Sequence, residues 1–271
     1  MMRRFAPAPL ALAMALMAAP GAQSATKTWA CTASYWDYED CWSPLGLPAP
    51  TDDALVAAVG GMDTVLRFDD FTDHRAVSRL TVNTALGGGS VTFEQSGGSL
   101  STRDTTIGGT GKGSFRQTGG LHSVSSSLVV DGPTVEAMYR LEGGSLTTRT
   151  SFVGLGGVGR FEQTGGTHNS QEVLLTGDSS QYLMRGGTLQ AAAAVSIGSG
   201  ARYFHEAGTV TVPYLLVGRA DGFGDYLMKS AGAPSTGVLN ADAVQVGYRG
   251  LMVLDGAAAV TTQTLRVGDG D

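Results

Sequence analysis

Short segments of alternating apolar and polar residues recur along most of the chain. Each opens with an aromatic residue and reaches glycine four residues later, as where Phe115 opens F-R-Q-T-G-G. Further along each copy, two apolar residues two positions apart precede another glycine, as at Val195 and Ile197. A period of two is typical of a half-buried β-strand, and glycine supplies the positive φ angles of tight turns. Each copy therefore predicts strand, turn, strand, turn.

The aromatic residues define a repeat of about 22 residues. A unit of this size cannot bury its own apolar face, so successive copies must stack. Stacking predicts an aromatic ladder inside the coil, made of Phe93, Phe115, Tyr139, Phe161, Tyr182, Phe204 and Tyr226. The residue after each anchor is usually charged or polar and is expected to face solvent: Glu94, Arg116, Arg140, Glu162 and His205.

The pattern predicts an all-β fold, a parallel β-solenoid with one copy per rung. Anchors alternate between Phe and Tyr from residue 115, and a paired unit of about 45 residues also suits a β-propeller blade, which is the alternative fold. Composition supports a β protein. Gly is 40 of 271 residues, too many for helix interiors, and a hydrophobic fraction of 42% is too high for a disordered chain.

The N-terminal residues have the pattern of a secretory signal peptide. Arg3 and Arg4 precede an apolar run, and small residues precede a cleavage site expected before Ala25. We expect a leader at 1–24, an N-terminal cap at 25–53 and solenoid repeats at 54–271. Without the two arginines the net charge falls from −6 to −8, which argues against nucleic acid or an anionic membrane as a partner. No later segment is apolar enough to span a membrane.

Cys31 and Cys41 are the two cysteines of the chain. Two cysteines in an exported chain usually pair. The alternative, a metal clip, lacks the further ligands that zinc needs. We therefore expect a disulfide that closes the N-terminal cap.

The repeats resemble those of passenger regions in bacterial autotransporters and related adhesin-like β-helix proteins. The F-x-Q-T-G-G stretches, the segment between Val153 and Phe161, and the tryptophans at 29, 36 and 42 carry this resemblance. It implies an exported protein at the cell surface or outer membrane, with the periplasm as an alternative. Such passengers continue into an outer-membrane β-barrel, and no barrel pattern follows these repeats, so a chain truncated at the C-terminus is expected.

Candidate chemistry is sparse. His122 and His168 hold equivalent places two rungs apart, roughly 10 Å, too far to share one ion, so we interpret them as packed or hydrogen-bonded residues. The acid-rich stretch from Phe68 to Arg75 is the most enzyme-like cluster, but charge runs are usually solvated loops. The final Gly-Asp-Gly-Asp is half of a calcium-binding repeat and stands alone.

The sequence therefore predicts a secreted structural or adhesive repeat protein of the bacterial surface, with no catalytic, cofactor or metal site. Its polar outer faces suit weak multivalent contacts with surface glycans or proteins. The alternative is a carbohydrate-active, pectin-lyase-like enzyme on the same fold, which would need clustered acids on adjacent rungs.

Overall fold

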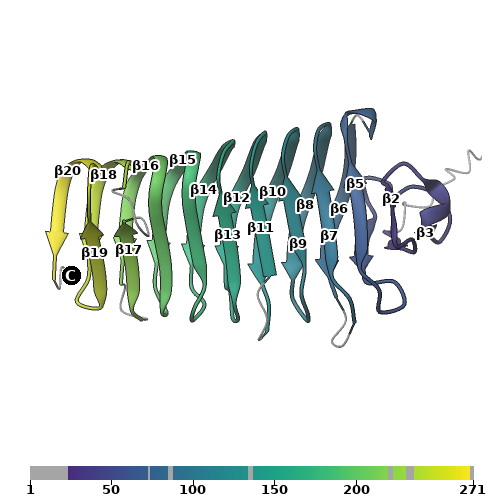
Figure 1. Ribbon diagram of the computed structural model, residues 1–271, viewed down its shortest axis with the longest axis horizontal. Helices are drawn as coiled ribbons and strands as arrows, with labels where there is room; N and C mark the ends of the chain where they lie inside the picture. Colours follow the sequence, from purple (N-terminus) through teal and green to yellow (C-terminus); the bar gives the residue numbers. More distant parts are fainter. Residues whose placement is uncertain are drawn as a thin grey trace, which may run out of the picture.

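The computed structural model describes residues 24–72, 74–84, 88–133, 137–218, 222–229 and 235–268. These residues form a parallel β-solenoid of about 10 turns (Figure 1). The rungs follow one another in a line, which confirms the predicted solenoid and excludes the propeller alternative. The expected leader at 1–24 lies outside the described residues except for Ser24.

Two kinds of strand alternate along the solenoid. The short strands are β5 (Thr64–Phe68), β7 (Val91–Gln95), β9 (Ser114–Gln117), β11 (Ala137–Leu141), β13 (Gly159–Gln163), β17 (Gly224–Met228) and β19 (Gly250–Leu254). The long strands are β6 (His74–Asn83), β8 (Ser99–Gly108), β10 (Leu121–Asp131), β12 (Ser145–Val153), β14 (Thr167–Leu175), β18 (Val238–Val246) and β20 (Ala259–Val267). In β15 (Gln181–Ile197) and β16 (Ala201–Val217) both parts of a rung form one strand.

Strands of one kind pair in parallel with their equivalents in the neighbouring rungs. Phe93 pairs with Phe115, Phe115 with Tyr139, and Tyr139 with Phe161. Each rung thus repeats the last one at the strand spacing of about 4.8 Å. A side chain that points inward in one rung has an inward neighbour directly above and below it.

The inward aromatic rings form a continuous stack. Its members, all 0% exposed, are Phe68, Phe93, Phe115, Tyr139, Phe161, Tyr182, Tyr203 and Tyr226. From Phe93 onward, successive ring centroids lie 4.6 to 5.0 Å apart, and from Phe93 to Tyr203 the rings are within 16° of parallel. The strand spacing sets this distance, so the rings touch without any distortion of the backbone.

The ladder differs from the sequence prediction in one rung. Tyr203, not Phe204, pairs with Tyr182 and lies in the stack, so the assignment of Phe204 to the core ladder was wrong. Phe204 lies half-buried on the outer face, opposite Leu183. Because side chains alternate along a strand, His205 then points inward and is fully buried, whereas we expected it to face solvent.

From Phe115 to Tyr182 the stack alternates between Phe and Tyr, and hydrogen bonds between rungs accompany this alternation. The Tyr139 hydroxyl donates to Oε1 of Gln117 in the preceding rung at 2.7 Å, and Tyr182 donates to Gln163 in the same way. Gln95 is followed by Phe115, which has no hydroxyl, and Gln95 Oε1 is buried without a hydrogen-bond partner among the described residues. An interior glutamine is therefore fully paired only when tyrosine follows it.

Stacked glycines make the turns after β7, β9, β11 and β13. Gly144 has φ 75°, and a Cβ there would lie 2.4 Å from the carbonyl oxygen of Gly120 in the rung below. Only glycine combines this left-handed backbone with so close an approach. The Gly pairs of the repeat are thus required by both the turn and the stacking.

The N-terminal cap contains β1 (Thr26–Trp29), β2 (Ala33–Tyr35), the 3-10 helix η1 (Glu39–Cys41) and β3 (Trp42–Ser43), followed by β4 (Asp53–Ala57). Cys31 and Cys41 form a disulfide within it. Trp36 is fully buried and its ring meets Phe68 and Phe93 edge-on, with centroids 5.8 and 6.0 Å apart. The cap therefore covers the N-terminal end of the aromatic stack.

Phe161→Ala should lower the free energy of unfolding by about 3–5 kcal/mol, because it leaves a cavity between Tyr139 and Tyr182. Phe152→Ala is the matched control, since Phe152 lies half-buried on the outer face of the preceding rung, and should cost less than about 1.5 kcal/mol. Urea denaturation measures both. Equal midpoints would contradict the inward position of the ring.

Gln117→Met should destabilise the protein by about 1–3 kcal/mol more than Gln95→Met. Both amides donate to two backbone carbonyls, but only Gln117 accepts a tyrosine hydroxyl. The same rod already holds methionine at Met184, in the equivalent place. Paired denaturation curves test this; an equal loss at both sites would show that the tyrosine bond contributes nothing.

Candidate functional site

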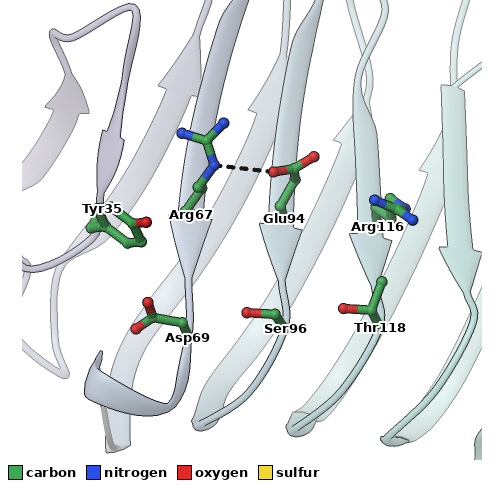
Figure 2. Close-up of a pocket in the computed structure, with 7 residues that line it drawn as sticks. All are labelled: Tyr35, Arg67, Asp69, Glu94, Ser96, Arg116 and Thr118. Atoms are coloured by element: carbon green, nitrogen blue, oxygen red, sulfur yellow. Dashed lines mark ion pairs between the residues drawn. The ribbon is translucent and has the colours of Figure 1, made fainter.

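A hollow lies on the outer face of the short-strand sheet at the N-terminal end of the rod (Figure 2). Its volume is about 160 Å³, and β2, β5, β7 and β9, with the turns that follow β5, β7 and β9, surround it. The lining side chains are Tyr35, Arg67, Asp69, Glu94, Ser96, Arg116 and Thr118. We define these seven residues as the Tyr35 hollow.

The lining residues form two rows across three rungs, as Figure 2 shows. Each residue of the first row directly follows an inward-pointing residue of a short strand. The row contains Arg67, Glu94 and Arg116, which pair in register across the three rungs. The other row lies two residues further on and contains Asp69, Ser96 and Thr118. Parallel register alone therefore assembles a grid of hydrogen-bonding groups from residues far apart in sequence.

Tyr35 closes the hollow at its N-terminal end. Tyr35 pairs with Arg67 across β2 and β5, and its side chain is 42% exposed. Its ring stacks against Tyr38, with centroids 6.3 Å apart and an interplanar angle of 29°. Arg75 donates to the neighbouring Asp37 at 2.6 Å, which ties the cap loop to the first rungs. The Tyr35 ring is thus in contact with Tyr38 and still partly exposed.

Opposite charges pair within and beside the hollow. Arg67 Nε lies 3.3 Å from Glu94 Oε2. Arg116 donates two hydrogen bonds to Glu142, at 2.9 and 2.8 Å. These bonds raise the pKa of the Arg116 guanidinium and lower the pKa of the Glu142 carboxyl. Because the bond is bidentate, it fixes the plane of the guanidinium as well as its position.

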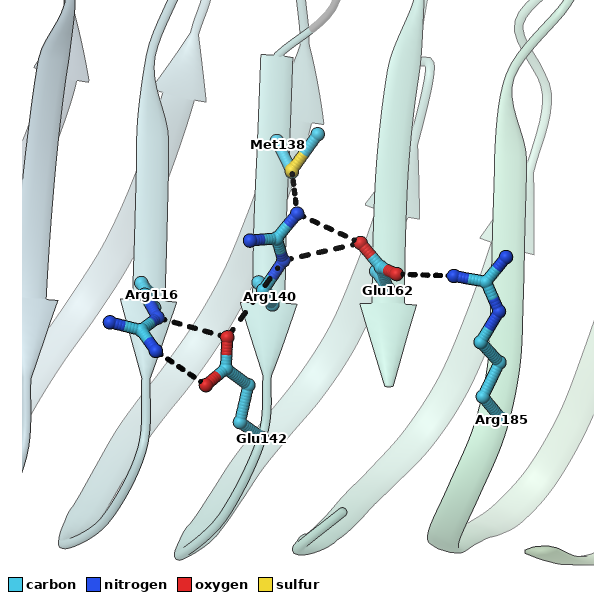
Figure 3. A network of polar contacts seen from close by, with 6 residues as sticks. All are labelled: Arg116, Met138, Arg140, Glu142, Glu162 and Arg185. Atoms are coloured by element: carbon cyan, nitrogen blue, oxygen red, sulfur yellow. Dashed lines mark hydrogen bonds and ion pairs between the residues drawn. The ribbon is translucent and has the colours of Figure 1, made fainter. Parts of the chain in front are cut away.

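The pairing continues along the rod as an alternating chain of arginines and glutamates (Figure 3). Arg140 contacts both Glu142 and Glu162, at 3.9 and 3.1 Å, and Arg185 contacts both Glu162 and Glu206, at 2.8 and 3.1 Å. Glu162 was predicted to face solvent, and its exposure was wrongly predicted although its direction was right. Its carboxylate lies on the outer face, but the arginines of both neighbouring rungs cover it and leave the residue 6% exposed.

The acid-rich stretch from Phe68 to Arg75 does not form a catalytic cluster in the described residues. Asp69 accepts hydrogen bonds from the backbone of Phe71 and Thr72 and so caps the 3-10 helix η2 (Asp70–Thr72). Asp70 accepts a bond from the Gly98 backbone in the next rung. Asp73, like the last three residues of the predicted Gly-Asp-Gly-Asp motif, lies outside the described residues. The acids that are described hold turns in place.

His122 and His168 lie in the interior, one in each of two similar hydrogen-bonded clusters. His122 stacks on Phe115, with centroids 4.8 Å apart, and its ring nitrogens contact the hydroxyls of Thr105 and Tyr139. The Tyr139 hydroxyl donates to Gln117, which assigns the ring proton of His122 to Nδ1. Neither histidine has an open side from which a ligand could approach, because both are 0% exposed.

Burial lowers the pKa of both His122 and His168 from the ordinary 6.5 to about 3. It also raises the pKa of Tyr139 and Tyr182, so these hydroxyls stay neutral hydrogen-bond donors. The histidines therefore remain uncharged over the range in which an exposed histidine titrates. They add polar connections between rungs without adding buried charge.

Sequence reasoning did not find the Tyr35 hollow. No group of three or more His, Cys, Asp or Glu residues that could hold a metal ion occurs among the described residues. In the same part of the chain, no helix is long and apolar enough to cross a membrane. The signal that marks the hollow is positional, because Ser96 and Thr118 both lie three residues after their aromatic anchors. Asp69 could not be added from the sequence, since Leu66 takes the place of the anchor in its rung.

Comparison of the chain with models of protein families, with curated proteins and with solved structures gave no match.

The buried histidines predict a loss of stability in acid. The unfolded chain binds protons at His168 below about pH 6.5, whereas the folded chain does so only near its pKa of about 3. The stabilising contribution is therefore complete above pH 6.5 and is lost as the pH falls toward 3, by about 2 kcal/mol per histidine at about pH 5.

His168→Leu should remove about 2 kcal/mol of the difference between the unfolding free energies at about pH 7 and about pH 5. Leucine already fills this row at Leu146 and Leu189. His74→Gln, at an exposed histidine of β6, is the control and should leave the difference unchanged. Urea titrations at both pH values decide; an unaltered difference in His168→Leu would refute the buried neutral state.

Proposed function

We propose that the protein is an exported, surface-associated β-solenoid with a structural and adhesive role and no catalytic step. The observation that carries the proposal is the arrangement of charged side chains on the outer face of the short strands. Its charged side chains pair with one another from rung to rung, and between Tyr35 and Thr118 they leave an open hollow. A rigid face of this kind presents hydrogen-bonding groups at fixed spacing, which suits binding to repetitive partners.

The engagement of the acids favours binding over hydrolysis. Glycoside hydrolysis needs two carboxyl groups free to act on the scissile bond, one as acid and one as base or nucleophile. In the hollow, Asp69 accepts bonds from its own turn and Glu94 is held by Arg67. Both carboxylates are therefore anchored to the protein, Asp69 through one of its two oxygens, rather than free to act as an acid and base pair.

The N-terminal pattern and the cysteine pair support export. The bridge between Cys31 and Cys41 is of the kind that persists in oxidising compartments. Expression of the full chain in a diderm bacterium should give an exported product that begins at Ala25, as read by intact mass. A product in the cytoplasm that keeps residues 1–24 would contradict export.

Adhesion and catalysis are separated by one experiment on purified residues 25–271. The protein should be retained on immobilised extracellular polysaccharides or matrix proteins and should release no reducing sugar ends from the polysaccharides. Heat-unfolded protein is the control for non-specific retention. Release of reducing ends would favour the enzyme instead, and the absence of retention on every surface would refute the adhesive role.

A further inference from the structure

The Tyr35 hollow offers hydrogen-bonding groups of more than one kind on three adjacent rungs. The Ser96 and Thr118 side chains are exposed, and hydroxyls both donate and accept. Arg67 supplies planar donors, and Asp69 supplies carboxylate acceptors beside them. Adjacent donors and acceptors of this kind match neighbouring hydroxyl groups of a sugar, each of which also donates and accepts.

The spacing of the grid selects an extended ligand along the rod. Equivalent side chains repeat every rung, at about 4.8 Å. A chain of pyranose rings joined through equatorial bonds advances by close to one rung for each sugar. Successive sugars of such a chain are turned over, so each edge meets the two rows at every second rung, and both edges carry hydroxyl groups. A coiled chain would leave the rows after one sugar.

The charges in the hollow favour an uncharged ligand. Arg67 is paired with Glu94, and Arg116 is paired with Glu142. Asp69 adds a carboxylate whose hydrogen bonds come from neutral groups, the Phe71 and Thr72 backbone among them. No guanidinium of the hollow is left over to neutralise an acidic sugar, so a uronate would face Asp69 without compensation.

Tyr35 adds a stacking surface at the end of the grid. Its ring is held by Tyr38 and remains 42% exposed beside Arg67. The axial C–H groups of a pyranose form an apolar face that packs on an aromatic ring, while the equatorial hydroxyls point sideways to polar groups.

We propose that the Tyr35 hollow binds a neutral oligosaccharide of extended, equatorially linked pyranoses lying along the solenoid axis, with one sugar stacked on Tyr35. This inference rests on the proposed adhesive function and specifies its ligand class and its site.

Calorimetric titration of residues 25–271 with cellohexaose, a neutral β-1,4-linked hexamer, tests the proposal. Tyr35→Ala should weaken binding about tenfold through the lost stacking, and Tyr35→Phe should bind as the parent does. Ser96→Arg should abolish binding, because it fills the middle of the hollow. Tyr214→Ala is the control: Tyr214 is 56% exposed on a long strand outside the hollow, and its loss should change nothing.

Thermal melting of each variant establishes that it is folded, as expected for changes at exposed positions. Binding of cellohexaose that is unchanged in both Tyr35→Ala and Ser96→Arg would overturn the proposal, and so would no binding at all. Tighter binding of hexagalacturonate than of cellohexaose would overturn the neutral ligand class. In each of these cases the adhesive role stands if the protein is still retained on an immobilised matrix, and falls if it is not.

Discussion

In-register stacking is the constraint on which the rest of the structure depends. Every rung repeats the last at the spacing of a parallel β-sheet, so each inward side chain meets its own equivalent above and below. Flat aromatic rings meet this condition well, because offset-stacked rings are in contact at the centroid distances of 4.6 to 5.0 Å that the stack shows. Polar groups meet it only by bonding to a neighbouring rung, as Tyr139 bonds to Gln117. Like charges stacked inside the rod would repel one another, and the buried histidines stay neutral.

The same register organises the outside of the rod. Columns of outward residues bring together side chains more than twenty positions apart in the sequence. In one column Arg140 lies beside Glu162, and the two form an ion pair across rungs. Pairs with more exposed partners, such as Arg116 with Glu142, contribute little stability individually. Their effect in this rod is to fix the direction of each side chain. A surface whose polar groups already point in set directions loses less entropy when it binds a partner.

Much of the fold could be predicted from the sequence, because periodicity two and stacked glycines leave few other arrangements. The choice of Tyr203 over Phe204 could not, since glycine lies four residues after Phe204 whereas Ala207 stands there for Tyr203, and only the pairing with Tyr182 selects Tyr203. The burial of Glu162 was missed because a single strand does not show what lies across from it. The Tyr35 hollow was missed for a related reason. The aromatic repeat marks its two rows only from the rung of Phe93 onward, because Leu66 takes the anchor position in the rung before, and the non-repetitive cap supplies Tyr35.

The hydrogen bonds between interior Gln and Tyr residues point in one direction along the chain. A tyrosine hydroxyl reaches back to the rung before it, so Gln117 is satisfied by Tyr139 and Gln163 by Tyr182. A rung that ends in glutamine is therefore incomplete until the next rung is in place, whereas the rung of Tyr139 ends in Leu141 and leaves no such acceptor. Two pairs of rungs in the middle of the rod, Phe115 with Tyr139 and Phe161 with Tyr182, therefore close on a tyrosine. These pairs are natural units for shortening, lengthening or grafting the rod.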